Sequence, residues 1–328
     1  MIAGSMGLRS VVTGVLLCTA LLSGPARADQ PAIPRIGVHV VPLANSPHEA
    51  GLRDGLRELG YVEGTNIVIN WWRSTGATEN QRSVVADLAR SKPDVLVVFS
   101  TLAARAALEV TTTIPIVFLS GDPVTSGLAQ SLAHPGGNAT GVSVVVTELT
   151  AKRLEFLRLL APRARRIACL MNSSNPSGVQ QLEAAQQAAR TLGVQLVTLD
   201  ARNAVELDAA LRALQRGAAD GVLVTGDILF RVNRSKVTQA VRKARLPATF
   251  PFREYHEDRA LMSYGPNLRD TGRKMAVYVD KILKGAKPAD LPIEQMSKYE
   301  LVVDLRVARE LGLDVPQELL LSADEVIK

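Results

Sequence analysis

The sequence predicts an α/β protein of two lobes, each built around a doubly wound parallel sheet. Three strand-like landmarks recur in the same order in both halves of the chain. They are Arg35-Ile36-Gly37-Val38, residues 94–98 and residues 114–118 in the first half, and Arg166-Ile167-Ala168-Cys169-Leu170, residues 220–224 and residues 246–250 in the second. Ile36 and Pro115 lie 79 residues apart, and Ile167 and Pro247 lie 80 apart. Two similar lobes in one chain create a cleft that can hold a ligand.

The first half alternates between strand-like and helix-like segments. Ser46-Pro47-His48-Glu49 has the pattern of a capping box with proline at the first helical position, and leucines at helical spacing follow it up to Gly60. The apolar run 94–99 after Lys92-Pro93 is typical of a strand covered on both faces. The remaining strands are expected at 67–72 and 114–119, with helices around 84–88 and at 103–110.

The second half repeats this alternation. A helix at 148–160 leads into the strand at 167–171, and Asn175-Pro176 predicts the start of a helix that Gly193 closes. Further strands are expected at 194–199, 221–224 and 247–250, with helices around 207–214 and at 232–244. Strands that alternate with helices imply right-handed crossovers and parallel sheets.

Polar residues follow the carboxyl ends of these strands, where open parallel sheets bind their ligands. In the first half they include Asn45, Ser46, Ser100, Thr101 and Asp122. In the second half they include Asn172, Ser173, Ser174, Gly226, Asp227, Phe252 and Arg253, and the aromatic Tyr264 lies near these loops. Helix N-termini follow most of the loops and favour an anion, whereas Asp122 and Asp227 can receive a cation. We therefore expect a ligand with both charges, such as an amino acid, although the same residue types also serve simply as helix caps.

The N-terminus has the pattern of an export signal. Residues 11–22 are mostly apolar, Arg9 precedes them, and Ala26-Arg27-Ala28 supplies small residues for cleavage after Ala28. The apolar core is too short to span a bilayer, which needs roughly 20 residues. Removal of Arg9 and Arg27 lowers the net charge from +6 to +4. We expect an exported, monomeric protein of 300 residues in which Cys169, the one remaining cysteine, is a small buried apolar residue.

The residue patterns that zinc binding, serine hydrolysis and phosphate binding require are absent from this sequence. The four histidines do not have zinc-like spacing, no G-x-S-x-G elbow occurs, and Val142 stands where a phosphate-binding loop needs lysine. His256-Glu257-Asp258 is interpreted as solvated surface. The charge is mild and aromatic residues make up only 4%, which gives no indication of nucleic-acid binding. No catalytic residue, metal or cofactor is predicted.

Several strings together resemble one protein family along essentially the whole mature chain. They are residues 55–64 (GLRELGYVEG), 112–118 (TTIPIVF), 135–141 (PGGNATG), 282–292 (ILKGAKPADLP) and 323–327 (ADEVI). They resemble the periplasmic binding proteins of ABC transporters grouped with tryptophan- and phenylalanine-type binders. The resemblance implies a type I periplasmic binding fold, in which two lobes joined by a hinge of three crossings close on a ligand.

Under that fold the chain divides into four parts. Residues 1–28 are the signal peptide, 33–145 plus 265–292 form lobe one, 146–264 form lobe two, and 293–328 supply the third crossing and the tail. The resemblance also implies ligand-binding roles. Ser100 and Thr101 match the family's small polar residues in lobe one, and Asn172 and Asp227 match its second-lobe Asn and acidic residue. Gly226 and Ile228 depart from the Thr-Asp-Asn pattern of the aromatic amino acid binders, which argues against an aromatic ligand.

The sequence therefore favours a periplasmic solute-binding protein, not an enzyme, that passes a small polar ligand to a membrane ABC permease. Three alternatives remain open. A ligand-sensing transcription regulator has the same two-lobed body, but the export signal occupies the place of its DNA-binding helix pair. An extracytoplasmic sensor that signals to a receptor has the same sequence features. A cleft enzyme would use Asp122 and Asp227 as its carboxylates.

Overall fold

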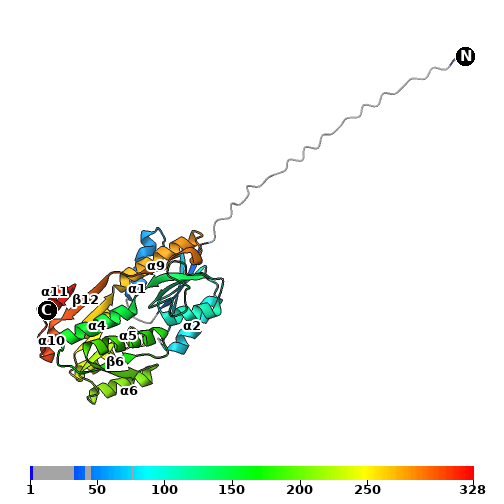
Figure 1. Cartoon of the computed structure of the whole chain (residues 1–328). Helices are drawn as coiled ribbons and strands as arrows, with labels where there is room; N and C mark the ends of the chain where they lie inside the picture. The colour runs from blue at the N-terminus through cyan, green and yellow to red at the C-terminus, as the bar shows by residue number, and fades with distance from the viewer. Residues whose placement is uncertain (3–32, 41–45, 76) are drawn as a thin grey trace. The chain divides into compact units, whose positions relative to one another are not determined.

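The computed structural model describes residues 1–2, 33–40, 46–75 and 77–328. The chain divides into two units, Met1–Ala32 and Ile33–Lys328, and the following description concerns the second (Figure 1). Nearly all of the predicted signal peptide, Asn45 and the rest of the loop at 41–45 lie outside the described residues. None of the helices in the described ranges is long and apolar enough to cross a membrane.

The first lobe contains a six-stranded sheet in the order β11-β5-β4-β3-β1-β2, and all its pairings are parallel. Its strands are β1 (Arg35–Val40), β2 (Val68–Arg73), β3 (Val95–Val98), β4 (Ile116–Ser120), β5 (Ala139–Ser143) and β11 (Glu294–Gln295). Its helices are α1 (Pro47–Glu58), α2 (Thr78–Arg90), α3 (Thr101–Val110) and α9 (Leu268–Leu283), with the short 3-10 turn η2 (Pro288–Asp290).

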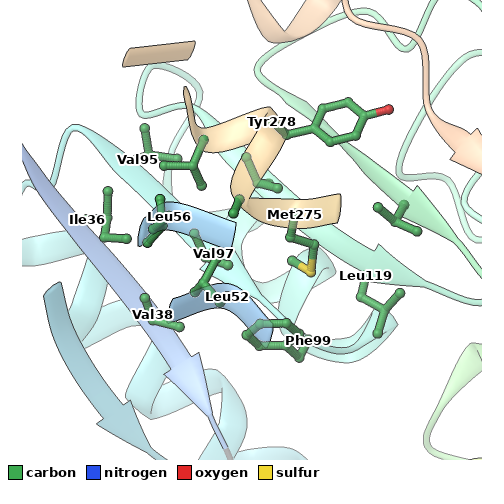
Figure 2. Packing of buried hydrophobic residues seen from close by; sticks show 14 of the residues in the cluster. Ile36, Val38, Leu52, Leu56, Val95, Val97, Phe99, Leu119, Met275 and Tyr278 are labelled. Atoms are coloured by element: carbon green, nitrogen blue, oxygen red, sulfur yellow. The ribbon is translucent and has the colours of Figure 1, made fainter. Parts of the chain in front are cut away.

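Alternating side chains of these strands build a core on each face of the sheet. On one face α1 and α9 pack against each other and cover β1 and β3, as Figure 2 shows for Leu52 and Leu56 of α1 and Met275 of α9. On the other face Leu96 and Phe118 pack against α2 and α3. Helices on both faces are the feature of the doubly wound sheet that the sequence predicts.

The second lobe contains a seven-stranded sheet in the order β13-β12-β10-β9-β8-β6-β7, parallel except for the antiparallel pair β10–β12. Its strands are β6 (Arg166–Met171), β7 (Gln195–Asp200), β8 (Gly221–Val224), β9 (Ala248–Phe250), β10 (Met262–Pro266), β12 (Tyr299–Asp304) and β13 (Glu325–Ile327). Its helices are α4 (Val146–Leu160), α5 (Pro176–Leu192), α6 (Ala204–Gln215), α7 (Ile228–Val232), α8 (Arg234–Lys243), α10 (Leu305–Leu311) and α11 (Gln317–Ser322), with the 3-10 helix η1 (Arg253–Asp258). Helices α4 and α5 cover one face, and α6 and α8 cover the other.

The two sheets confirm the predicted α/β fold and its internal repeat. The order β2-β1-β3-β4-β5 in the first sheet matches β7-β6-β8-β9-β10 in the second. The repeat extends to a hydrogen bond at the start of each sheet. The Arg35 backbone N–H donates to Asp94 at 2.7 Å, and the Arg166 backbone N–H donates to Asp220 at 2.8 Å. Cys169 is fully buried as expected, and burial raises the pKa of its thiol to about 12.

The chain passes between the two sheets three times, from β5 to α4, from β10 to α9 and from β11 to β12. A group of three aromatic side chains, which we call the aromatic group, lies at these passages. Tyr264 makes an edge contact with Phe156 at 5.2 Å between ring centroids, and its ring lies 6.0 Å from that of Tyr299.

The structure differs from the sequence-based expectation at two places, the predicted Ser46 cap of α1 and the predicted surface position of His256. Helix α1 begins at Pro47 as predicted, but the Ser46 side chain makes no capping hydrogen bond and is buried. The interpretation of His256 as solvated surface was wrong, because its side chain is buried against Ser263 at 3.0 Å. Burial lowers the pKa of His256 to about 4, and the positive φ of Arg259 turns the chain into β10 after it. Glu257 is exposed, as expected for that position.

Candidate functional site

A cavity of about 100 Å³ lies where the carboxyl ends of strands from both sheets meet. The first lobe lines it with His48, Gln81, Phe99, Ser100, Thr101, Leu102, Leu119, Ser120, Gly121, Val144 and Leu268. Val146 begins α4 and Pro266 ends β10, so these two lining residues lie at the passages between the lobes. The second lobe lines it with Asn175, Ser177, Gly226, Asp227, Ile228, Arg231 and Phe252. The site therefore lies at the position that the strand ends of open parallel sheets predict.

The polar wall of the first lobe is built around the N-terminus of α3. Ser100 caps this helix, since its Oγ accepts the backbone N–H of Ala103 at 3.1 Å while its hydroxyl donates to Gln81 at 3.0 Å. Thr101 Oγ1 lies 3.0 Å from Ser120 Oγ. Hydroxyl groups and a helix N-terminus on one wall give that wall a preference for an anionic group.

The polar wall of the second lobe is Asp227, the N-cap of α7. One carboxylate oxygen accepts the backbone N–H of Leu229 at 2.8 Å, and the other accepts the side-chain amides of Asn175 at 2.7 Å and Asn172 at 3.3 Å. Burial raises the pKa of Asp227 despite these three donors. No cationic side chain within the described ranges pairs with it, so the carboxylate is a buried anion that a ligand cation can neutralise.

Gln181 of α5 holds the loop that carries Asp227. Its amide bonds the backbone of Gly226 twice, accepting the N–H at 2.7 Å and donating to the carbonyl at 3.1 Å. Its oxygen also accepts from the buried guanidinium of Arg153 at 3.3 Å. Arg153 donates further to the Val224 carbonyl at 3.1 Å, and burial lowers the pKa of Arg153 to about 10. These bonds fix the end of β8 and hence the direction of Asp227.

We expect Gln181→Leu to lower the free energy of unfolding by about 2–4 kcal/mol, because it leaves the Gly226 N–H and one Arg153 donor without their acceptor. Urea unfolding followed by circular dichroism measures this loss. Gln186→Leu, an exposed position on the same helix, is the matched control and should change stability by less than about 0.5 kcal/mol. Equal stability of the two variants would contradict a structural role for this amide.

Apolar side chains make up most of the rest of the lining. Phe99 is stacked with the imidazole of His48 at 4.8 Å between ring centroids, with an angle of 12° between the planes. Phe252 lies in the second lobe, with the Arg231 guanidinium 5.9 Å from its ring centroid. The cavity therefore suits a ligand whose body is apolar and whose charged groups lie at its two polar walls.

Side chains of the two lobes also touch each other around the cavity. Arg231 Nη1 lies 3.3 Å from His48 Nδ1, and the Gln180 side-chain amide lies 3.3 Å from Ser126 Oγ. Gly121 of lobe one approaches Ser177 so closely that a Cβ atom on Gly121 would lie 2.7 Å from Ser177 Oγ. The two lobes are therefore in direct contact around the cavity.

The structure brings five of the predicted site residues to the cavity lining, namely Ser100, Thr101, Gly226, Asp227 and Phe252. Two others lie close behind it. Asn172 supports Asp227, and Ser46 lines a void of about 10 Å³ that adjoins His48 and Arg231.

The other predicted residues have different surroundings. Ser173 bonds Asp200 through its backbone N–H and hydroxyl, and the Ser174 N–H donates to the Asn172 side chain. The Asp122 carboxylate accepts from Thr147 at 3.4 Å, Arg253 pairs with Glu325 at 2.7 Å, and Tyr264 belongs to the aromatic group at the passages. None of these five side chains belongs to the cavity lining given above.

Sequence reasoning missed several lining residues that lie in helices or cap them. His48 occupies the first turn of α1, Asn175 and Ser177 begin α5, and Arg231 lies in α7. Asn175 could have been found, because it follows a strand end by the same rule that selected Asn172. The positions of His48 and Arg231 depend on how the lobes meet, which the strand spacing does not contain.

The fold and this site define the class of two-lobed binding proteins, with a cavity between the two lobes. The chain belongs to the family of ABC transporter substrate binding proteins, which it matches over residues 40–327.

Similar proteins carry related descriptions. A "Tyrosine-binding protein" of Clostridioides difficile is 25% identical over 277 residues, which cover 84% of this chain and 78% of that protein. A Streptococcus pneumoniae domain solved in complex with L-Trp is 26% identical, with a TM-score of 0.82 over 90% of this chain and 99% of that one. A substrate binding protein with adhesive properties from Clostridium difficile, solved in its ligand-free, open structure, is 25% identical over the same shares with a TM-score of 0.61.

Proposed function

We propose that this protein is an exported solute-binding protein that captures an amino acid with an apolar side chain and delivers it to a membrane ABC permease. The observation that carries the proposal is Asp227, a buried carboxylate without a cationic partner in the described part of the chain, at the wall of a mostly apolar cavity. A ligand ammonium group at this position would neutralise the buried charge.

The opposite wall suits the ligand's carboxylate. The N-terminus of α3 and the hydroxyl groups of Ser100, Thr101 and Ser120 favour an anion there. The apolar side chain would then contact Phe99 and Phe252. The relative named a tyrosine-binding protein and the domain solved in complex with L-Trp support an amino acid as the class of ligand.

The size of the cavity favours a small side chain. A volume of about 100 Å³ has to hold the whole ligand, including its ammonium and carboxylate groups, so little room remains for a large side chain. An aliphatic side chain such as that of leucine, isoleucine or valine needs less width than an indole ring. We therefore infer that this protein prefers aliphatic amino acids over tryptophan.

The proposal includes closure of the lobes on the ligand. The contacts across the cleft support a closed conformation, as does the greater similarity to the complex with L-Trp than to the ligand-free, open structure. Since a ligand touches both walls only when the cleft is shut, binding would shift the equilibrium toward the closed form by that difference in affinity. The ligand would leave unchanged, without turnover.

Thermal unfolding with a panel of ligands tests this function. A ligand that binds only the folded state adds about 2.7 kcal/mol to the free energy of unfolding when its concentration is 100 times its Kd. L-leucine, L-isoleucine or L-valine should therefore raise Tm by about 5 °C or more. Isoamylamine and 4-methylpentanoate, which each lack one charge of leucine, are the matched controls and should have little effect. A response to neutral sugars alone would refute the proposal.

The proposed location is the periplasm, reached through the leader that ends at Ala28. Expression of the full-length gene in a bacterium, followed by N-terminal sequencing of the periplasmic protein, should give Asp29 as the first residue. Recovery of the whole protein from the cytoplasm with Met1 retained would contradict it.

A further inference from the structure

His48 and Arg231 meet across the closed cleft. His48 belongs to α1 of lobe one, is 5% exposed, and is stacked on Phe99. Arg231 belongs to α7 of lobe two and is 4% exposed, and its Nη1 lies 3.3 Å from His48 Nδ1. This pair joins the two lobes directly beside the ligand cavity.

The chemistry of the pair fixes the protonation state of His48. A guanidinium group has only donors, so His48 Nδ1 must be the acceptor and its ring must carry a single proton, on Nε2. Burial, with the charge of Arg231 as a second cause, lowers the pKa of His48 well below its ordinary value. A protonated imidazole would instead direct an N–H at the guanidinium.

Arg231 is held in place from its own lobe. Its Nε and Nη2 donate to the two carboxylate oxygens of Glu254 at 2.7 and 2.9 Å. This bidentate bond neutralises the guanidinium, and both of its partners belong to lobe two. Nη1 is the group left to reach lobe one, so the geometry favours a contact between lobes over a counter-ion for the ligand.

We propose that the His48–Arg231 bond is a closing contact that forms only with a neutral imidazole, so that ligand affinity falls as His48 becomes protonated in the open form. This inference rests on the proposed capture of a ligand by lobe closure. In the open form an unperturbed histidine has a pKa of about 6.5. Because closure must expel that proton, the ligand Kd should rise about tenfold for each pH unit below this value.

The other charged groups around His48 differ from it in how they titrate. Arg231 and Glu254 form the pair described above, and His39 of β1 bonds Ser74 and has a pKa lowered by burial to about 4. On α9, which packs against α1, Arg269 and Arg273 pair with Asp54. On α1 itself Glu49 pairs with Arg73 at 2.8 Å. Asp227 of the same cavity can also titrate, because burial raises its pKa. A variant that removes only the titration of His48 therefore separates the two sources.

Calorimetric titration of L-leucine at pH 7.5 and 5.5 tests the proposal, because a free amino acid keeps its charges over this range. The wild-type Kd should rise about tenfold. His48→Asn places an oxygen acceptor near the position of Nδ1 but does not titrate, so its Kd should change less than twofold between the two pH values. His48→Phe keeps a ring on Phe99 without an acceptor, and should bind at least tenfold more weakly at pH 7.5.

Each contrary result has its own meaning. A wild-type Kd that is equal at the two pH values, or a His48→Phe variant that binds like wild type, would overturn the closing contact while the proposed function stands. A full pH dependence in His48→Asn would assign the effect to Asp227 and likewise overturn it.

A test without ligand separates failure of the contact from failure of the proposed function. The Gly121→Cys/Ser177→Cys double variant can close a disulfide across the cleft, because a Cβ on Gly121 would lie 2.7 Å from Ser177 Oγ. In the oxidised protein, ¹⁵N NMR of the imidazole should show His48 neutral with its proton on Nε2 down to pH 5.5. Titration of His48 near 6.5 in this locked form would overturn the proposal even if L-leucine does not bind.

Discussion

Replacement of Asp227 by asparagine is expected to weaken amino acid binding by about 100-fold. The carboxylate is buried, and no cationic side chain in the described part of the chain pairs with it. The ligand ammonium would therefore be its cationic partner. A hydrogen bond to a charged group contributes roughly 1.5–3 kcal/mol, and 1.4 kcal/mol is a factor of ten in Kd. Calorimetric titration of L-leucine measures the change at pH 7.5.

Asp122→Asn is the matched control, because this carboxylate also follows a strand end but lies outside the cavity lining. Its Kd should stay within about twofold of wild type. Equal losses in the two variants would contradict the assignment of Asp227 to the ligand cation.

The same substitution has a separate effect on stability. Asp227 accepts three N–H groups, and an asparagine there would present its own amide N–H to Asn175 or to the Leu229 backbone. We expect a loss of about 1–2 kcal/mol in the free energy of unfolding, measured by urea unfolding without ligand. Affinity and stability are thus measured independently.

The raised pKa of Asp227 determines the direction in which the free energy of unfolding changes with pH. Burial raises the pKa of Asp227, so the folded state keeps a proton that the unfolded state releases near 3.8. The ligand-free protein should therefore lose this contribution as pH rises from about 3.8 through the raised pKa, and Asp227→Asn should lack that step. A wild-type minus variant difference that grows with pH would contradict the shift.

The sequence was sufficient to predict the fold because parallel strands carry their own signals. Buried strands such as Val95–Val98 appear as continuous apolar runs, and the matching spans from Ile36 and from Ile167 identified the repeat before any contact was known. The strand-end rule also placed Ser100 and Asp227 at the cavity. These inferences depend on local pattern and on one topological rule.

The remaining part of the site depends on contacts between lobes. Arg231 lies within a five-residue helix, and nothing in its neighbourhood of the sequence distinguishes it from the many exposed arginines. Its role follows from Glu254, 23 positions later, and from His48, 183 positions earlier. Asp122 and Arg253 satisfy the strand-end rule equally well, but Thr147 and Glu325 hold them elsewhere. Only the packing of the two lobes selects among such residues.

A side chain at Gly121 that is not bonded to residue 177 across the cleft is expected to hold the cleft open. A Cβ there would lie 2.7 Å from Ser177 Oγ of the facing lobe and 2.8 Å from a methyl group of Val146. The small shifts that accommodate one methyl group should cost Gly121→Ala several-fold in affinity, whereas the branched Gly121→Val should lose about 100-fold or more. Since the backbone bonds of Gly121 to Thr101 and Ser143 remain, Tm without ligand should change little.

Gly226→Ala is the matched control on the facing lobe. A Cβ at Gly226 would find its nearest neighbour, the Gln181 oxygen, at 3.5 Å, which is ordinary contact, so its affinity should fall less than about threefold. Small-angle scattering separates blocked closure from a merely filled cavity. Wild type and Gly226→Ala should become more compact with saturating L-leucine, and Gly121→Val should not. A Gly121→Val protein that compacts normally while binding weakly would show that the side chain fills the cavity and does not oppose closure, and the cleft contact at Gly121 would then have no part in lobe movement.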